Sequence, residues 1–181
     1  MSEQIELTDP VDHSVGGIYG HLFRRGFHIG MSILPFLYYE YGDAISDTFS
    51  MTRLQFVSVM VLALVIGEAI RLKLGITIFG QRDYESKQVS ALAWGAFAIG
   101  ITFLVLSDYP ELVWPLMISL SLGDPFIGEV RRKGYESRTV FIIGSIFISG
   151  IWLASGYLVD TPYLLAILMG PLCVAAEWPR L

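Results

Sequence analysis

The order of apolar and polar residues along the chain predicts a series of hydrophobic helices. A polar stretch opens the chain, and six apolar stretches follow it, separated by short polar connections. A helix needs about 20 residues to cross a bilayer. Three stretches are near this length, the first reaches it only with its charged start, and two are shorter. The stretches are residues 18–41, 54–72, 89–106, 110–123, 140–158 and 162–176.

Composition favours lipid as the solvent for much of this chain. Of its 181 residues, 54% are hydrophobic and 16% are charged, and the mean hydropathy is +0.58. A chain of this length has too little interior to bury so much apolar surface. We therefore expect an all-α, polytopic membrane helix bundle with about six transmembrane segments. Residues 18–181 would form one transmembrane catalytic domain, preceded by a polar, acidic N-terminal tail, 1–17.

The basic residues predict how this bundle is oriented. With six crossings, eleven of the twelve Lys and Arg residues fall on one side, and only Arg53 falls on the other. Lys and Arg in short loops stay on the cytoplasmic side of a membrane. We therefore expect a multi-pass protein of the cell membrane with both termini, and any active site on the basic side, facing the cytoplasm.

Several classes of function are disfavoured by composition. The formal net charge of −5 argues against nucleic-acid binding through a basic surface. The single cysteine, Cys173, allows no internal disulfide and no cysteine-based zinc site. The stretches 89–106 and 140–158 carry no charged residue, whereas transporters more often place polar residues inside several spans. Arginines, lysines and carboxylates gather instead on the basic side, where they suit phosphate groups and Mg²⁺.

Two candidate clusters lie at helix ends on the basic side. Arg24 and His28 are four residues apart, so they share one helix face, and Arg25 adds a second charge. This cluster either binds an anion or anchors the first span. Glu68 and Arg71 close a long apolar run, where a carboxylate is costly unless it is paired or functional. Their spacing predicts an ion pair on the helix face.

The strongest pattern follows the fourth stretch. Asp124 lies between Gly123 and Gly128, and Glu129 comes next. Asp124 either caps a new helix after a break or holds a metal ion, while the glycines let backbone N–H groups approach a phosphate. Three bases follow directly: Arg131, Arg132 and Lys133.

Two further sites belong to the same side. A polar loop carries Arg82 and Lys87, which either face water or contact nucleotide phosphates. Glu177 closes the last stretch, as a solvated terminal acid or as a metal or base carboxylate.

The order of these motifs resembles the polyprenol kinase family, which includes dolichol kinase, phytol kinase and the CTP-dependent diacylglycerol kinase. The resemblance implies a kinase that uses CTP and a divalent cation such as Mg²⁺ to phosphorylate a membrane lipid alcohol. It covers residues 23–179 and rests on Arg24, Arg25 and His28, on Glu68 and Arg71, and on Gly123, Asp124 and Gly128.

Under this interpretation the residues divide by role. Asp124 would hold the metal ion, with Glu129 or Glu177 as a second ligand. His28, Glu68 or Asp124 would accept the proton of the lipid hydroxyl. The nucleotide would be bound by Arg24, Arg25, Arg71, Arg82, Lys87, Gly123, Gly128, Arg131, Arg132 and Lys133.

Two other functions remain open at this point. A cytidylyltransferase that makes a CDP-lipid also needs acids and a basic loop at a cytoplasmic membrane face. A non-catalytic membrane subunit or a small transporter needs no such site. The sequence leaves open the lipid alcohol, the choice between CTP and ATP, and the oligomeric state. The products separate the two enzymes, since a kinase releases CDP and a cytidylyltransferase releases pyrophosphate.

Overall fold

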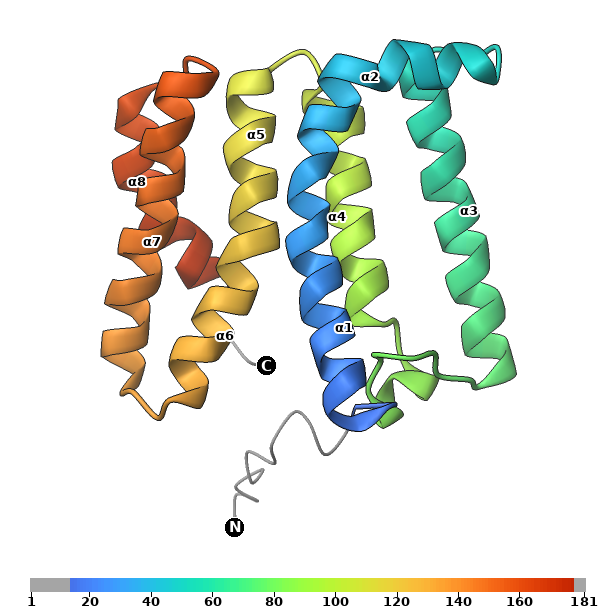
Figure 1. The fold of residues 1–181 in the computed structure, drawn as a ribbon, viewed down its shortest axis with the longest axis horizontal. Coiled ribbons are helices and arrows are strands. Elements are labelled where there is room, and N and C mark those ends of the chain that lie inside the picture. The colour runs from blue at the N-terminus through green and yellow to red at the C-terminus, as the bar shows by residue number, and fades with distance from the viewer. Residues whose placement is uncertain (1–13, 178–181) are drawn as a thin grey trace.

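The structure, a computed structural model, describes residues 14–177, and these form an all-helical bundle that contains no strand (Figure 1). The all-α class expected from the sequence is confirmed. The elements are α1 (Gly17–Gly30), the 3₁₀ turn η1 (Met31–Ile33), α2 (Leu34–Thr48), α3 (Arg53–Leu74), the 3₁₀ segment η2 (Asp83–Lys87), α4 (Ala91–Leu106), α5 (Pro110–Ile118), the π-helical turn η3 (Ser119–Gly123), α6 (Asp124–Arg132), α7 (Ser137–Leu158) and α8 (Tyr163–Glu177).

The first predicted helix is divided into two. η1 separates α1 from α2, and α2 extends to Thr48, beyond the expected boundary. Figure 1 shows α2 lying across one end of the bundle before the chain turns into α3. The pair formed by α1–α2 and α3 bends by 82°. Thr52 caps the start of α3 with a capping box, in which its hydroxyl accepts a hydrogen bond from the backbone N–H of Gln55 at 3.2 Å.

The fourth predicted stretch continues without a break. α5 passes through η3 directly into α6, and Pro125, which has no N–H to donate to the helix, lies just after the π turn at the second position of α6. The structure therefore does not contain the helix break that would make Asp124 an N-cap. One inserted π turn, a feature often found at functional sites, precedes Asp124 instead.

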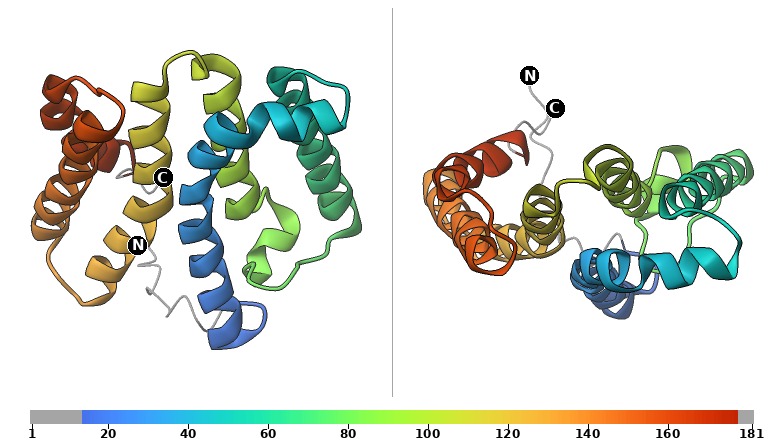
Figure 2. Two further views of the ribbon diagram at one scale, coloured as in Figure 1. Left: turned by 45° about the horizontal axis from the view of Figure 1, so that its top comes forward. Right: turned by 90° about the horizontal axis from the view of Figure 1, so that it is seen from above.

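Two hydrophobic clusters form the core, and the α5–α6 segment belongs to both. One cluster joins η1, α4 and α5 through Met31, Ile99, Phe103, Val113 and Met117. The other joins α6, α7 and α8 and includes Ile127, Val130, Ile148, Trp152 and Val174. Figure 2 shows the α7–α8 pair at one side of the bundle and α3 at the other, with α1, α4 and α5 between them.

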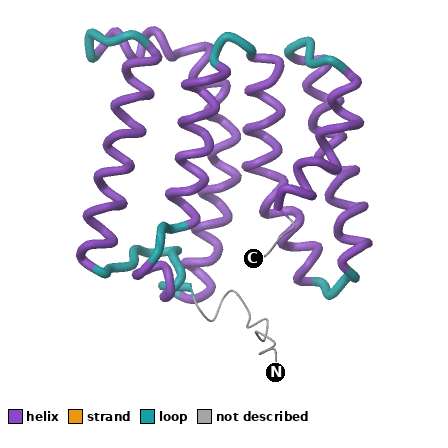
Figure 3. Tube along the Cα trace, turned by 180° about the vertical axis from the view of Figure 1, so that it is seen from behind, coloured by secondary structure: helices purple, strands orange, loops and turns teal. Residues whose placement is uncertain are grey.

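The connections gather at two opposite ends of the bundle (Figure 3). The start of α1, the end of α3, η2 and the α6–α7 turn lie at one end, which we call the basic end. All Lys and Arg residues of 14–177 except Arg53 belong to the elements that meet there. Arg53 lies at the opposite end, paired with Asp43 at 2.8 Å.

Large apolar side chains cover much of the outer surface. They are exposed along α3, α7 and α8, and Ile146 and Ile167 are about two-thirds exposed. Among the described residues, α7 alone is long and apolar enough to cross a bilayer, and the bent pair α1–α2 and α3 gives a second candidate if it counts as one span. The other apolar helices, α4 and α8, have 16 and 15 residues.

Candidate functional site

Arg71 is the best-satisfied side chain at the basic end. Its Nε and Nη2 donate to both carboxylate oxygens of Glu68, at 2.8 and 2.7 Å. Nη1 donates to the carbonyls of Ile76 and Glu85, and Nη2 also donates to the carbonyl of Gln88. All five guanidinium donors are thereby used. The predicted ion pair is confirmed, but these contacts leave Arg71 no donor for a nucleotide phosphate.

Glu68 is equally occupied. Besides Arg71, its carboxylate accepts from the backbone N–H of Ser90 at 2.6 Å, and Ser90 is the N-cap of α4. Its side chain is only 10% exposed. Glu68 and Arg71 therefore join α3 to the start of α4, which favours a structural role for Glu68 over the predicted role as a base.

Glu85 is a site residue that sequence reasoning missed. Its side chain is 3% exposed, and it meets Arg24 of α1 at 3.3 Å. Its two carboxylate oxygens also accept from the backbone N–H groups of Arg82 and Ala91, at 2.9 and 3.0 Å. One buried carboxylate thus connects α1, η2 and the first turn of α4, and it orients the guanidinium of Arg24.

A second ionic contact ties α1 to α6. Arg25 Nη1 lies 2.6 Å from Glu129 Oε2, and Arg132 Nη2 lies 3.1 Å from Glu129 Oε1. The guanidinium of Arg25 and, to a smaller extent, that of Arg132 hold the pKa of the Glu129 carboxyl below its ordinary value. Glu129 is consequently engaged as a clamp between two helices and is a poor metal ligand.

This clamp gives the protein a pH-dependent stability. Because the pKa of Glu129 is lower in the folded state, its contribution is present above the ordinary glutamate pKa of about 4.3. It is lost as pH falls through the lower folded value. We expect the wild type to exceed Glu129→Gln in Tm at pH 7, with the difference shrinking below about pH 4. Thermal unfolding across pH tests this, and the difference should be smaller in an Arg25→Met background.

His28 and Asp124 face each other where α1 meets the π turn. His28 Nδ1 lies 3.9 Å from Asp124 Oδ2, which is too long for a hydrogen bond. The His28 side chain is 8% exposed, whereas that of Asp124 is 55% exposed. A Cβ added to Gly95 of α4 would lie 3.8 Å from the imidazole. The ring is therefore enclosed by α1, α4 and the start of α6, with its Nδ1 directed at an open carboxylate.

Several polar atoms around this π turn lack a partner. His28 Nδ1 and the hydroxyls of Ser119 and Ser121 are buried without a hydrogen bond within residues 14–177. Buried polar atoms are normally satisfied, so unpaired ones in a native structure need an explanation. Three of them lie in α1 and η3, which pack against each other and adjoin Asp124; unpaired buried atoms also occur in α7, at Ser145 and Trp152.

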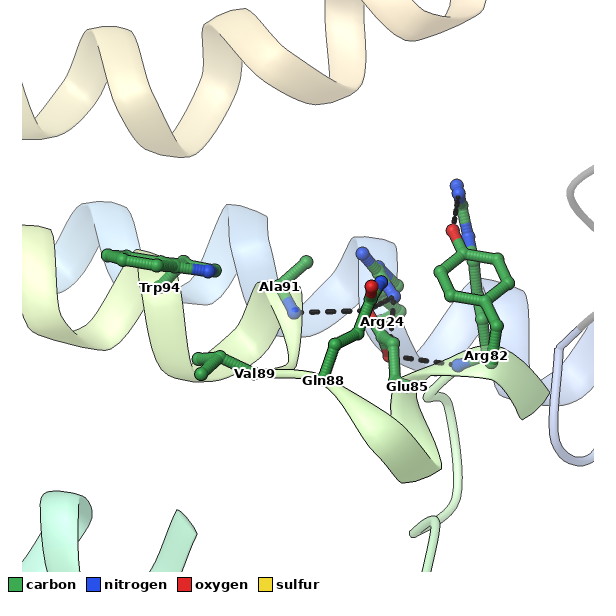
Figure 4. A pocket seen from close by; sticks show the side chains of 8 residues that line it. Arg24, Arg82, Glu85, Gln88, Val89, Ala91 and Trp94 are labelled. Carbon is green, nitrogen blue, oxygen red and sulfur yellow. Dashed lines mark hydrogen bonds and ion pairs between the residues drawn. The ribbon is translucent and has the colours of Figure 1, made fainter. Parts of the chain in front are cut away.

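A polar pocket of about 470 Å³ opens beside the same face of α1 (Figure 4). Arg24 belongs to its lining and is four residues before His28, which is about 6 Å along the helix axis. The pocket therefore lies about one turn of α1 from His28, although neither His28 nor Asp124 lines it. Its lining consists of Arg24, Arg82, Tyr84, Glu85, Gln88, Val89, Ala91 and Trp94.

The remaining predicted nucleotide-binding residues are less well placed. A Cβ on Gly123 would meet Ile148 at 3.4 Å, so this glycine packs against α7. Gly128 has open space around it, and both glycines lie in helical backbone instead of a phosphate-binding loop. Lys87 and Lys133 are exposed at the basic end, and Arg131 is half-buried in the last turn of α6.

The predicted metal ligands do not converge. Within residues 14–177, no three His, Cys, Asp or Glu side chains lie close enough together to hold a metal ion. Glu129 is held by two arginines, and the side chain of Glu177, at the end of α8, lies outside the described part of the chain. Asp124 is the predicted ligand that remains open.

The structure therefore brings Arg24 and Arg82 to one pocket and His28 close to Asp124, and it uses Glu68, Arg71 and Glu129 to hold the elements that carry them. Comparison with protein-family models, with curated proteins and with solved structures finds no match to this chain.

Proposed function

We propose that this protein is an integral membrane enzyme that transfers a phosphoryl group from a nucleoside triphosphate to the hydroxyl of an isoprenoid or other lipid alcohol. The donor is CTP by the family resemblance. One observation carries the proposal: a single face of α1 directs Arg24 into a polar pocket and, one turn later, His28 toward the exposed Asp124. Phosphoryl transfer depends mainly on positioning and charge neutralisation, which such groups provide.

The apolar surface supports a membrane location. Soluble monomers rarely expose contiguous apolar patches beyond a few hundred Å², whereas large apolar side chains are exposed along α3, α7 and α8. Only 28% of the apolar window of α7 is buried, so α7 does not resemble the core helix of a soluble protein. Lipid around these helices would cover this surface in a multi-pass bundle.

The distribution of charge supports a cytoplasmic site. The basic end carries the Lys and Arg residues of the described chain apart from Arg53. By the positive-inside rule this end faces the cytoplasm, where nucleoside triphosphates are available. The nucleotide would enter from water, and the lipid alcohol would come from the bilayer.

A divalent cation fits this site through Asp124. Mg²⁺ is usually held by one or two carboxylates together with phosphate oxygens and water, so a single open carboxylate is sufficient from the protein. The exposure of Asp124 and the unpaired buried polar atoms beside it agree with this use. When bound, the ion would neutralise charge on the phosphate oxygens.

The chain's own residues would then share three tasks. Arg24 and Arg82 bind phosphate oxygens, and Glu85 keeps Arg24 in place. His28 accepts the proton of the lipid hydroxyl, because its buried Nδ1 has no hydrogen bond in the described structure. The Arg25–Glu129 contact holds α6 against α1 and so sets the distance between His28 and Asp124.

A separate apolar cavity supports a lipid substrate. It has a volume of about 600 Å³, is open on one side, is lined by residues of α1, η1, α2, α3 and α4, and has Tyr38 and Arg53 as its polar side chains. Met31 lines it, and both Met31 and His28 lie within 4 Å of a Cβ added to Gly95. A lipid chain in the cavity would lie close to His28, the proposed proton acceptor.

Filling this cavity should impair use of the lipid. Ala96 lines the cavity, and Ala98 on the same helix is exposed and does not. We expect Ala96→Phe to raise the KM for the lipid alcohol roughly tenfold or more, as expected for about 1.4 kcal/mol of lost binding, with little change in the KM for nucleotide. Steady-state kinetics measure both constants. Ala98→Phe is the control, and an equal effect of both variants would contradict a role for the cavity.

The reaction itself is tested with purified protein in lipid nanodiscs. The protein is incubated with γ-labelled CTP or ATP, Mg²⁺ and a panel of polyprenol, phytol, geranylgeraniol and diacylglycerol. We expect label in a monophosphorylated lipid and release of CDP. In a parallel incubation with a lipid monophosphate as the acceptor, formation of a CDP-lipid with release of pyrophosphate would identify the cytidylyltransferase instead. Folded protein that modifies none of these lipids would overturn the proposal.

A further inference from the structure

The polar pocket has a direction along α1. The segment before the helix lies against Arg82, since Ser14 and Arg82 form an isolated bridge and Val15 donates to the carbonyl of Gln81 at 2.8 Å. Arg24 follows in the middle of α1, and His28 lies one turn further toward Asp124. The order from the water-facing end inward is therefore Arg82, Arg24, His28.

Arg82 carries an aromatic partner at the outer end of this series. Its guanidinium donates to the hydroxyl of Tyr84 and lies 5.8 Å from the centre of the Tyr84 ring. The Tyr84 side chain is 47% exposed and lines the pocket. Planar guanidinium and phenol groups at an open pocket wall are surfaces on which flat heteroaromatic rings stack.

The inner end of the pocket has a different character. Figure 4 shows Trp94 at the end away from Arg82, with Arg24, Glu85 and Ala91 between them. Trp94 precedes Gly95, the position that faces His28 and Met31. Trp94 is exposed at this end of the pocket, and an exposed tryptophan suits the boundary between water and lipid.

We propose that the nucleotide is bound with its base on Tyr84 and Arg82 and its phosphate chain running past Arg24 toward Asp124. This inference rests on the proposed function and adds the orientation of the nucleotide and the residue that holds its base. Tyr84 gives stacking area, Arg82 and Arg24 neutralise the first phosphates, and the terminal phosphate reaches the His28–Asp124 pair. The base thereby stays in water while the reacting phosphate meets the lipid hydroxyl.

Binding measurements without catalysis test this orientation. The probes are CTP and inorganic tripolyphosphate, which has the phosphate chain without the base. Stacking on an aromatic side chain is worth about 1–3 kcal/mol per base, so Tyr84→Leu should weaken CTP binding roughly tenfold and leave tripolyphosphate binding unchanged. Tyr84→Phe keeps the ring and should retain CTP affinity.

Two controls separate a base-binding role from general effects. Tyr135→Leu removes a similarly exposed tyrosine at the same end outside the pocket and should leave CTP binding unchanged. Trp94→Leu, at the other end of the pocket, should weaken CTP binding less than Tyr84→Leu does.

The outcomes distinguish this inference from the proposed function. If Trp94→Leu weakened CTP binding and Tyr84→Leu did not, the orientation would be reversed and the inference wrong, although lipid phosphorylation would stand. Equal losses for CTP and tripolyphosphate in Tyr84→Leu would also overturn it. Wild-type protein that binds neither CTP nor ATP would overturn both.

Discussion

Asp124→Asn is expected to abolish phosphoryl transfer while leaving the protein folded. The substitution keeps the shape of the side chain but removes the negative charge that would hold the cation. Loss of one preorganised charge-stabilising group typically costs roughly 100- to 1000-fold in rate, and we expect a loss of that size. Because the Asp124 side chain is 55% exposed and approaches His28 only to 3.9 Å, folding should change little.

The matched control for this variant is Asp43→Asn. Asp43 is an exposed aspartate at the opposite end of the bundle, paired with Arg53. The same loss of charge there should leave transfer of the γ-phosphate unchanged. Labelled-CTP assays and thermal unfolding should be run on both variants in the same nanodiscs. Retained transfer by Asp124→Asn would remove the metal-binding role from this residue.

Arg71→Met is expected to destabilise the protein more than any other single change at the basic end. It removes the hydrogen bonds that Arg71 donates to the Glu68 carboxylate, which is 10% exposed, and to three backbone carbonyls. Removing one partner of a buried ion pair costs about 3–5 kcal/mol. For a chain of this size that corresponds to a drop in Tm of roughly 10 °C. The segment that carries Arg82 and Glu85 should lose protection from proteolysis first.

Two further variants define the cause of this loss. Arg71→Lys should not restore stability, because an ammonium group has three donors and cannot bridge both oxygens of Glu68 in the bidentate geometry. Lys73→Ala removes an exposed charge two residues away and should leave the Tm within about 1–2 °C of wild type. If Arg71→Met kept its Tm and lost only CTP binding, Arg71 would have to be a nucleotide ligand.

The helices could be predicted because their signals are local. Residues 54–72 and 140–158 are long apolar runs, and the structure has α3 and α7 there. The Glu68–Arg71 pair followed from helical spacing and is confirmed. The break within 18–41 and the π turn before Asp124 could not be predicted from local signals, because each depends on packing between helices that are distant in the sequence.

The candidate site depended on contacts that no local pattern contains. Glu85 lies in a loop of mixed charge, a pattern that predicts exposure to water. Its burial depends on Arg24, 61 positions earlier. Glu129 looked available for a metal, but Arg25, 104 positions earlier, occupies it. The approach of His28 to Asp124 was not predicted, since helical spacing relates residues within one helix and not between two.

The continuous α5–α6 helix has a mechanical consequence. Its first half packs with η1 and α4 and also contacts α7, and its second half packs with α7 and α8. The π turn between the halves is a natural hinge, and the His28–Asp124 gap lies beside it. Flexing there would change that gap directly. A ligand that contacted both Arg24 and Asp124 would connect α1 to the start of α6 beside this turn, so substrate binding and the rigidity of this part of the bundle would rise together.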